Sequence, residues 1–384
     1  MRELEVLLAS YDENKSNGLE CVLATLVHVE GSSYRQAGAR MLVNENGDMI
    51  GAISGGCLEG DALKKALLAM EQGQNKLITY DTSDEDDAVI GAQLGCNGVI
   101  QVLFEPIRND HVNNPIELIR KVIKSNEPSI IVTLFNLRKS QQQPGTKMIL
   151  DQEMNITGNV EDIGYLNVIK ANAHIAHSQF TSLFKEYHVS GETHHAFIEL
   201  CLPSPKLVLV GAGNDAQVLA QLATISGWNV IVTDGRSTHA SNSRFHSSCQ
   251  VFVSEPEKVL DNIQIDQRTA FVLMTHNYQY DISVFKLLLH EPGLNYIGIL
   301  GPKKKYQRML DELGYEGIRL TKEQASKIYA PIGLDLGAET PAEIGLSVLS
   351  EILAVLNNVN VGHLRERNSP IHNKSNLKFE VENV

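Results

Sequence analysis

A cysteine that directly follows two glycines is the most chemically suggestive feature of this 384-residue sequence. The stretch reads Ile-Ser-Gly-Gly-Cys-Leu-Glu, and apolar residues then recur at three- and four-residue spacing as far as Gly73. This spacing predicts a helix of about four turns with Cys57 in its first turn. Free N–H groups and the positive end of a helix dipole favour a thiolate at such a position. Gly55 and Gly56, which lack side chains, would let a bulky ligand approach the main chain closely.

A simpler interpretation also exists, because a free cysteine is most often a small buried residue. However, a second glycine-cysteine turn, Gly95-Cys96, lies within residues 91–98. Packing alone is a poorer explanation for two such turns than for one. We therefore treat both cysteines as candidate site residues, with a pair of tight structural turns as the alternative.

The elements before the cysteine turn are expected to bring further polar groups to it. A helix is predicted at 1–10, and strands are predicted at 19–29, 39–43 and 49–53. The loop after the first strand carries Ser32, Ser33 and Arg35, and Arg40 lies in the second strand. If these loops fold over one edge of the sheet, both arginines lie near Cys57.

Composition and charge restrict the class of protein. A net charge of −13 argues against a nucleic-acid partner, because phosphate backbones need a clustered basic surface. No apolar run approaches the ~20 residues that span a bilayer, and the first residues lack a signal-peptide core. We therefore expect a cytoplasmic protein with no membrane partner. The 5 cysteines include no Cys-x-x-Cys pair, so neither a structural zinc site nor a disulfide framework is expected.

The middle of the chain, residues 107–203, shows secondary structure but no recognisable chemistry. Helices are predicted at 116–123 and about 161–185, and strands at 129–137, 147–150, 155–160 and 196–202. The histidines of this segment fit no metal-ligand spacing, and packed or exposed histidines are the commoner explanation.

The second half contains the dinucleotide-binding fingerprint. An apolar strand runs into Gly-Ala-Gly-Asn-Asp-Ala, which begins at Gly211 and is the Gly-x-Gly-x-x-Ala form of the turn. Gly213 and Asn214 lie in this turn, a helix is predicted at 217–226, and the next strand ends at Asp234, where an acidic side chain receives ribose hydroxyls. Strand, glycine turn, helix, strand and acid together predict a Rossmann-like domain.

Polar residues follow other predicted strands of this half. Arg236 and His276 come after two of them, and Asp335 lies in a glycine-containing turn before an apolar helix predicted at 341–356. In parallel sheets such residues gather at the carboxyl edge, where ligands bind. His276 could contact a phosphate or act as an acid or base, or it could simply cap a strand end.

In their number and order, these motifs resemble those of the XdhC/CoxI family, the accessory proteins of molybdenum hydroxylases such as xanthine dehydrogenase. The motifs of the first block are Gly31-Ser-Ser-Tyr-Arg35, Gly38-Ala-Arg-Met41, Ser54-Gly-Gly-Cys-Leu-Glu59 and Gly95-Cys96. Those of the second are the Gly211 turn, Thr233-Asp-Gly-Arg236, Met274-Thr-His276, Tyr296-Ile-Gly-Ile-Leu-Gly301, Pro331-Ile-Gly-Leu-Asp-Leu-Gly-Ala338 and Thr340-Pro-Ala-Glu343. The resemblance implies an α/β protein with a mixed α/β N-terminal domain and a Rossmann-like, doubly wound parallel sheet. The expected boundaries are 1–106, a middle α/β segment at 107–203, 204–364, and a mobile polar tail at 365–384.

The resemblance also implies a function. It indicates a non-enzymatic chaperone that binds molybdenum cofactor (molybdopterin), assists its sulfuration with a cysteine desulfurase, and inserts it into a xanthine dehydrogenase-type hydroxylase. The cofactor-binding candidates are Ser32, Ser33, Arg35, Arg40, Gly55, Gly56, Cys57, Glu59, Cys96, Gly211, Gly213, Asn214, Asp234, Arg236, His276 and Asp335. A soft thiolate suits molybdenum, so Cys57 is also the candidate metal ligand.

Two other functions remain open from the sequence. One is an NAD(P)-dependent oxidoreductase with His276 as proton donor, and the other is a regulator whose Rossmann domain senses a nucleotide and controls partner docking. The apolar helix at 341–356 is expected to be exposed, which suggests a homodimer.

Overall fold

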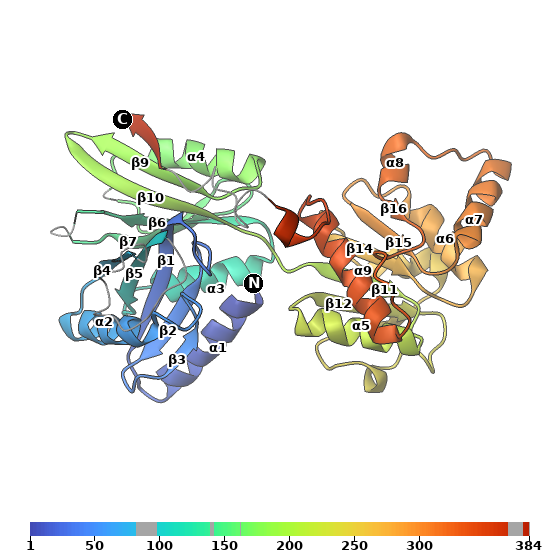
Figure 1. Cartoon of the computed structure of the whole chain (residues 1–384), viewed down its shortest axis with the longest axis horizontal. Helices are drawn as coiled ribbons and strands as arrows, with labels where there is room; N and C mark the ends of the chain where they lie inside the picture. The colour runs from blue at the N-terminus through green and yellow to red at the C-terminus, as the bar shows by residue number, and fades with distance from the viewer. Residues whose placement is uncertain (82–97, 139–141, 162, 368–378, 384) are drawn as a thin grey trace. The chain divides into compact units, whose positions relative to one another are not determined.

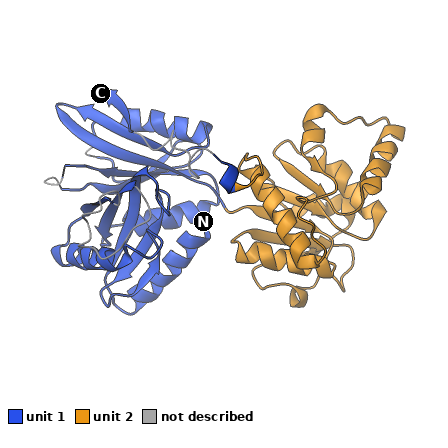
Figure 2. Ribbon diagram, in the orientation of Figure 1, with its two compact units in different colours: residues 1–203, 364–384 blue, residues 204–363 orange. Residues whose placement is uncertain are grey.

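The computed structural model describes residues 1–81, 98–138, 142–161, 163–367 and 379–383. The chain forms two compact units, which Figure 2 shows in different colours. Unit 1 comprises residues 1–203 and 364–384, and unit 2 comprises residues 204–363. Among the described residues, no helix is both long and apolar enough to cross a membrane.

The first sheet of unit 1 has five strands in the order β3-β2-β1-β5-β4, with every neighbouring pair antiparallel. Its elements are α1 (Arg2–Ser16), β1 (Cys21–Gly31), β2 (Arg40–Asn44), β3 (Met49–Gly51), α2 (Glu59–Gln72), β4 (Lys76–Asp81) and β5 (Gly98–Pro106). Ala62, Ala66 and Ala69 of α2 are fully buried against the sheet. The helix ends where Gly73 takes a left-handed conformation, as the sequence predicts.

The second sheet of unit 1 has the order β17-β9-β10-β6-β7-β8. Its elements are α3 (Pro115–Ser125), β6 (Ser129–Phe135), β7 (Gly145–Leu150), β8 (Ile156–Gly158), α4 (Leu166–Ser178), β9 (Leu183–Val189), β10 (Glu192–Cys201), η4 (Leu364–Glu366) and β17 (Glu380–Asn383). The prediction of one helix over 161–185 is wrong, because α4 ends at Ser178 and Phe180 takes a positive φ of 50°. The residues that follow pair with β10 as β9.

The tail also differs from expectation. A mobile polar segment is predicted from residue 365, yet β17 pairs in parallel with β9 at the edge of the second sheet (Figure 1). The expectation is therefore wrong for residues 380–383. The strand β17 forms on the edge of β9, almost two hundred residues earlier in the chain, and no local sequence pattern reveals this pairing.

Unit 2 is a sheet of six parallel strands in the order β13-β12-β11-β14-β15-β16. Numbered within the unit, this is the 3-2-1-4-5-6 order of the Rossmann fold, so the predicted α/β fold class is confirmed. The elements are β11 (Lys206–Val210), α5 (Asn214–Ile225), β12 (Asn229–Asp234), η2 (Asn242–Arg244), β13 (Gln250–Val253), η3 (Pro256–Asn262), β14 (Thr269–Leu273), α6 (Tyr278–Leu288), β15 (Tyr296–Ile299), α7 (Lys303–Tyr315), α8 (Lys322–Ser326), β16 (Ile328–Tyr329) and α9 (Pro341–Leu356). Separate apolar clusters cover the two faces, one with α5 and α9 and the other with α6 and α7.

Helix α9 begins with the predicted capping box, in which Thr340 and Glu343 satisfy each other's backbone N–H groups. The helix is only partly the exposed apolar surface that the sequence suggests. Its residues Val348 and Ile352 are buried in the cluster that contains α5, whereas Leu346 and Leu353, seven residues apart on one face, are 53% and 45% exposed. Packing within the unit thus explains one face of α9 and leaves two leucines exposed on another.

Candidate functional site

The strand register of the first sheet brings two described loops to one end. Gly31 at the end of β1 pairs with Gly98 at the start of β5, and Met41 at the start of β2 pairs with Gly51 at the end of β3. The loop with Ser32 and the turn with Cys57 therefore leave the same end of the sheet. Cys96 lies outside the described residues.

A hydrogen-bond network fixes the backbone around Cys57. The Glu59 carboxylate accepts from the N–H of Ser54 at 2.9 Å and from its hydroxyl at 2.5 Å. The Ser54 Oγ in turn accepts from the N–H groups of Gly56 and Leu58, both at 3.2 Å. Burial alone would raise the pKa of Glu59, but the hydrogen bonds from Ser54 and the backbone lower it. Glu59 is thus held as an anion that shapes the turn.

Cys57 projects from this turn into solvent. Its thiol lies 3.6 Å from the Ser54 Oγ and is exposed, whereas Cys21, Cys201 and Cys249 are buried. The prediction that Cys57 lies in the first helical turn is wrong by two residues, since α2 begins at Glu59. The helix starts later than predicted because the Ser54 side chain accepts from the N–H groups of Gly56 and Leu58 and holds these residues in a turn, which the sequence spacing does not reveal.

The two glycines of the turn have distinct roles. Gly56 has a φ of +107°, a region that residues with a Cβ rarely adopt, and a Cβ there would meet open space. Gly55 instead faces the ring of Tyr34, which would lie 3.2 Å from an added Cβ. This contact places the Ser32–Arg35 loop beside the cysteine turn, in agreement with the first half of the predicted cluster.

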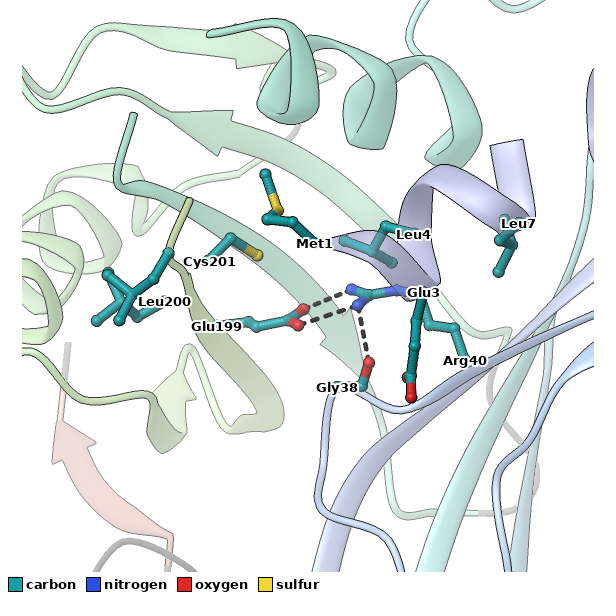
Figure 3. Close-up of a pocket in the computed structure, with 10 residues that line it drawn as sticks. Met1, Glu3, Leu4, Leu7, Gly38, Arg40, Glu199, Leu200 and Cys201 are labelled. Atoms are coloured by element: carbon teal, nitrogen blue, oxygen red, sulfur yellow. Dashed lines mark hydrogen bonds and ion pairs between the residues drawn. The ribbon is translucent and has the colours of Figure 1, made fainter. Parts of the chain in front are cut away.

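Arg40, which the sequence predicts for the same site, is held in a buried ion pair instead. Arg40 is buried, and its guanidinium makes a two-point ion pair with Glu199 of β10 and donates to the carbonyl of Gly38 at 2.9 Å (Figure 3). Burial opposes the charge, but Glu199 raises the pKa of Arg40 above its usual range. With its charge satisfied inside the protein, Arg40 cannot serve as a phosphate ligand, so its assignment to the site is corrected. It lines a pocket of about 240 Å³ with residues of α1 and β10.

Arg35, in contrast, is accessible to an anionic ligand. It pairs with Glu3 of α1 at 2.5 Å, and the two side chains are 27% and 71% exposed. Exposed pairs contribute roughly 0–1 kcal/mol, so a stronger anion can displace Glu3 at little cost. Of the two predicted arginines, only Arg35 lies in the loop that touches the cysteine turn.

The glycine turn of unit 2 has the backbone geometry of a dinucleotide-binding site. A Cβ at Gly211 would lie 2.7 Å from the main chain of Met274, so no side chain fits there. Gly213 precedes α5 in extended conformation, and its missing side chain leaves room near the exposed His276. Strand β11 lies between β12 and β14, at the point where the strand order reverses.

The acid of the fingerprint is not free for a ribose. Asp234 accepts from the N–H of Ala212 at 2.8 Å, and both of its oxygens accept from the Arg236 guanidinium, at 2.9 and 2.7 Å. Burial would raise the pKa of Asp234, but these hydrogen bonds lower it to about 2. The carboxylate therefore holds Arg236, whose side chain is 46% exposed, at the carboxyl edge of the sheet.

A further arginine, missed from the sequence, covers the glycine turn. Arg244 of η2 donates to the carbonyl of Ala212 at 2.7 Å and to the Asn214 side chain at 3.0 Å. It is the last residue of this short 3-10 helix, and no motif indicates it. The sequence shows only that a basic residue follows the second strand of the fingerprint.

The last predicted residue, Asp335, is exposed in a segment that α9 anchors. The Glu351 carboxylate accepts from the N–H of Gly333 at 3.0 Å, and the hydroxyl of Ser347 donates to the carbonyl of Leu334 at 2.6 Å. Tyr296 also donates to Glu351. Sequence reasoning missed Glu351 and Ser347, which look like ordinary positions of an amphipathic helix.

The described part of the chain offers few side chains that could bind a metal ion. Within the described ranges, no group of three or more His, Cys, Asp or Glu side chains lies close enough to hold a metal ion. A metal that arrives already chelated needs fewer protein ligands, and the exposed Cys57 could supply one.

Comparisons with known proteins agree with this architecture. A model described as the XdhC and CoxI family matches residues 15–81, and one described as the XdhC Rossmann domain matches residues 207–352. A Bacillus subtilis (strain 168) protein, named as a probable xanthine dehydrogenase subunit, is 34% identical over 336 residues, 87% of this chain and 92% of that protein. The Escherichia coli (strain K12) molybdenum cofactor insertion chaperone PaoD is 25% identical over 345 residues, which cover 88% and 84% of the two chains. A crystal structure of a xanthine dehydrogenase from Bacillus halodurans matches with a TM-score of 0.73 and 27% identity over 94% of this chain and 97% of that one. With the predicted motifs in both units and these matches along most of its length, the chain belongs to the XdhC and CoxI family.

Proposed function

We propose that this protein is an accessory factor that binds molybdenum cofactor as cargo and helps insert it into a xanthine dehydrogenase-type molybdenum hydroxylase. The observation that carries the proposal is the exposed thiol of Cys57 on a hydrogen-bonded turn, beside the hydroxyl-rich loop at 32–35. The name of the Escherichia coli relative, a molybdenum cofactor insertion chaperone, supports this role, and the name of the Bacillus subtilis relative supports the class of enzyme that is served.

The turn suits a cargo that must be held and then released. Cys57 is not packed into the core, so a soft metal could approach its sulfur without unfolding of the chain. The network of Ser54 and Glu59 fixes the turn in advance, which lowers the entropic cost of binding. A single protein sulfur, rather than a closed ligand cage, is consistent with transfer to another protein.

The anionic phosphate of the cargo is assigned to the neighbouring loop. Ser32 and Ser33 supply hydroxyl groups, and Arg35 supplies a charge that is paired with the exposed Glu3. Arg40 is left out because Glu199 neutralises it. In unit 2, Arg236, Asn214 and His276 at the glycine turn form a second polar set, which we propose as a site for a further polar group of the cargo or for a nucleotide.

We also propose that sulfuration of the cargo occurs on this protein with a cysteine desulfurase as the sulfur donor. The open setting of Cys57 leaves the metal end of a bound cargo accessible to such a partner. We also propose a homodimer, for which the exposed Leu346 and Leu353 of α9 are the apolar side chains that could contact a second copy.

The alternative of an NAD(P)-dependent oxidoreductase has weaker support. Both oxygens of Asp234 already accept hydrogen bonds from protein groups, so a ribose would have to compete with Arg236. A nucleotide-sensing role needs only binding and is separable by experiment, since it predicts nucleotide affinity without pterin binding.

The proposal is tested by cargo content. The chain is produced anaerobically in a host that makes molybdenum cofactor, and molybdenum and oxidised pterin are measured per chain. We expect both in the unmodified protein and a clear loss of molybdenum with Cys57→Ser. The matched control is Cys249→Ser, which changes a buried thiol of unit 2 and should retain the cargo. Absence of both molybdenum and pterin from the unmodified protein, despite cofactor supply, refutes the chaperone role.

A further inference from the structure

The C-terminal segment pairs with the edge of the second sheet of unit 1 in the way that a bound peptide would. Strand β17 adds to the free edge of β9, with Glu380 opposite Lys185 and Glu382 opposite Tyr187. The other described strand pairs of this sheet are antiparallel, whereas this pair is parallel. The segment is thus an added strand from a remote part of the chain, the geometry by which many proteins bind extended peptides.

An aromatic slot anchors the segment at its first described residue. The Phe379 ring stacks on His28 with a centroid separation of 4.2 Å and meets His195 edge-on at 4.9 Å. The rings of Phe135 and Phe184 both lie 6.1 Å away. These four residues come from β1, β6, β9 and β10, so the slot is built by the folded unit and not by the segment that fills it.

Charge complementarity fixes the residues that follow. The Lys185 ammonium lies 2.6 Å from Glu380 and 3.0 Å from Glu382, and the lysine side chain is only 5% exposed. Burial would lower the pKa of Lys185, but the two carboxylates raise it. Between them, Val381 is 58% exposed and contributes little. The segment therefore supplies both counter-charges of a lysine that it helps to cover.

We propose that this edge of the sheet is a docking site for an extended segment of a partner protein, in which an aromatic residue is followed by acidic residues at the next and third positions. The chain's own Phe379-Glu-Val-Glu382 is the tethered occupant. A partner segment of the same chemistry competes with it, gaining the β9 edge, the aromatic slot and the Lys185 charge. This role is independent of cargo binding at Cys57.

The test uses the full chain and a fluorescent peptide with the sequence of residues 377–384. Tethering gives the native tail a high effective concentration, so the unmodified protein should bind the peptide weakly. Phe379→Ala weakens the tail and should raise peptide affinity at least tenfold, while the same peptide with alanine in place of its phenylalanine should not bind. Val381→Thr, a change at an exposed side chain, is the control and should behave like the unmodified protein.

A charge-reversal experiment guards against a variant that fails to fold. Lys185→Glu should reject both its own tail and the acidic peptide, and should bind a peptide in which lysines replace the two glutamates. Circular dichroism confirms folding of each variant. Equal binding of the peptide by the unmodified and Phe379→Ala proteins, or binding of both charge forms by Lys185→Glu, overturns the proposal.

Discussion

Replacing Glu199 with glutamine tests the conclusion that Arg40 is structural. The Arg40 and Glu199 side chains are 3% and 12% exposed, so Glu199→Gln leaves a buried guanidinium without its counter-charge. Breaking one partner of such a pair costs about 3–5 kcal/mol. With a urea m-value of about 2 kcal/mol per molar, the unfolding midpoint of unit 1 should fall by about 1.5–2.5 M.

The assay can separate the two units. Trp228 is the only tryptophan and lies in unit 2, so its fluorescence follows that unit, while backbone hydrogen exchange of β1 and β10 follows unit 1. The control is Asp12→Asn, which breaks an ion pair with Arg120 whose side chains are 52% and 23% exposed and should cost about 0–1 kcal/mol. The reasoning is refuted if Glu199→Gln shifts unit 1 no more than Asp12→Asn does, or if the Trp228 transition shifts instead.

Three other predictions concern the cysteine turn and the acid of unit 2. Gly56→Ala should destabilise unit 1 by about 1–2 kcal/mol, because the φ of Gly56 is +107°. The control Gly60→Ala, in α2, should instead stabilise unit 1 by about 0.4–1 kcal/mol. Equal effects of the two substitutions on urea unfolding contradict the assigned turn. In the native protein, iodoacetamide should alkylate Cys57 well before the buried Cys21, Cys201 and Cys249, and peptide mapping that finds any of these three reacting as fast excludes the exposed turn. The folded pKa of Asp234, about 2, lies below its unfolded value of about 3.9, so its contribution to the stability of unit 2 is present above pH ~4 and is lost as the pH falls towards 2. Asp234→Asn should remove that part of the pH dependence of the Trp228 transition, and an unchanged acid profile argues against the ion pair with Arg236.

Local signals were sufficient for much of the fold. The glycine turn at Gly211 and the βα alternation predict the parallel sheet of unit 2, which the strand order confirms. The capping box at Thr340 and the helix end at Gly73 are likewise found where short motifs place them. These features depend on residues a few positions apart, for which sequence spacing carries the necessary information.

Pairings between distant residues could not be predicted in the same way. Arg40 meets Glu199 from the second sheet, and β17 meets β9 across the whole of unit 2 in sequence. The chemistry of both arginine predictions was reasonable, yet only the fold decides which guanidinium is already neutralised. The ion pair between Asp234 and Arg236 is a local contact. It still could not be predicted, because an acid followed two residues later by an arginine is equally compatible with two unpaired side chains.

The most direct measurement for the central claim is transfer of cargo. Protein purified with molybdenum cofactor is mixed with a cofactor-free xanthine dehydrogenase-type hydroxylase, and recovered hydroxylase activity is followed over time. The proposed role predicts recovery that scales with the molybdenum supplied, that persists with Cys249→Ser and that falls sharply with Cys57→Ser. Recovery no greater than that with cofactor-free accessory protein would contradict it.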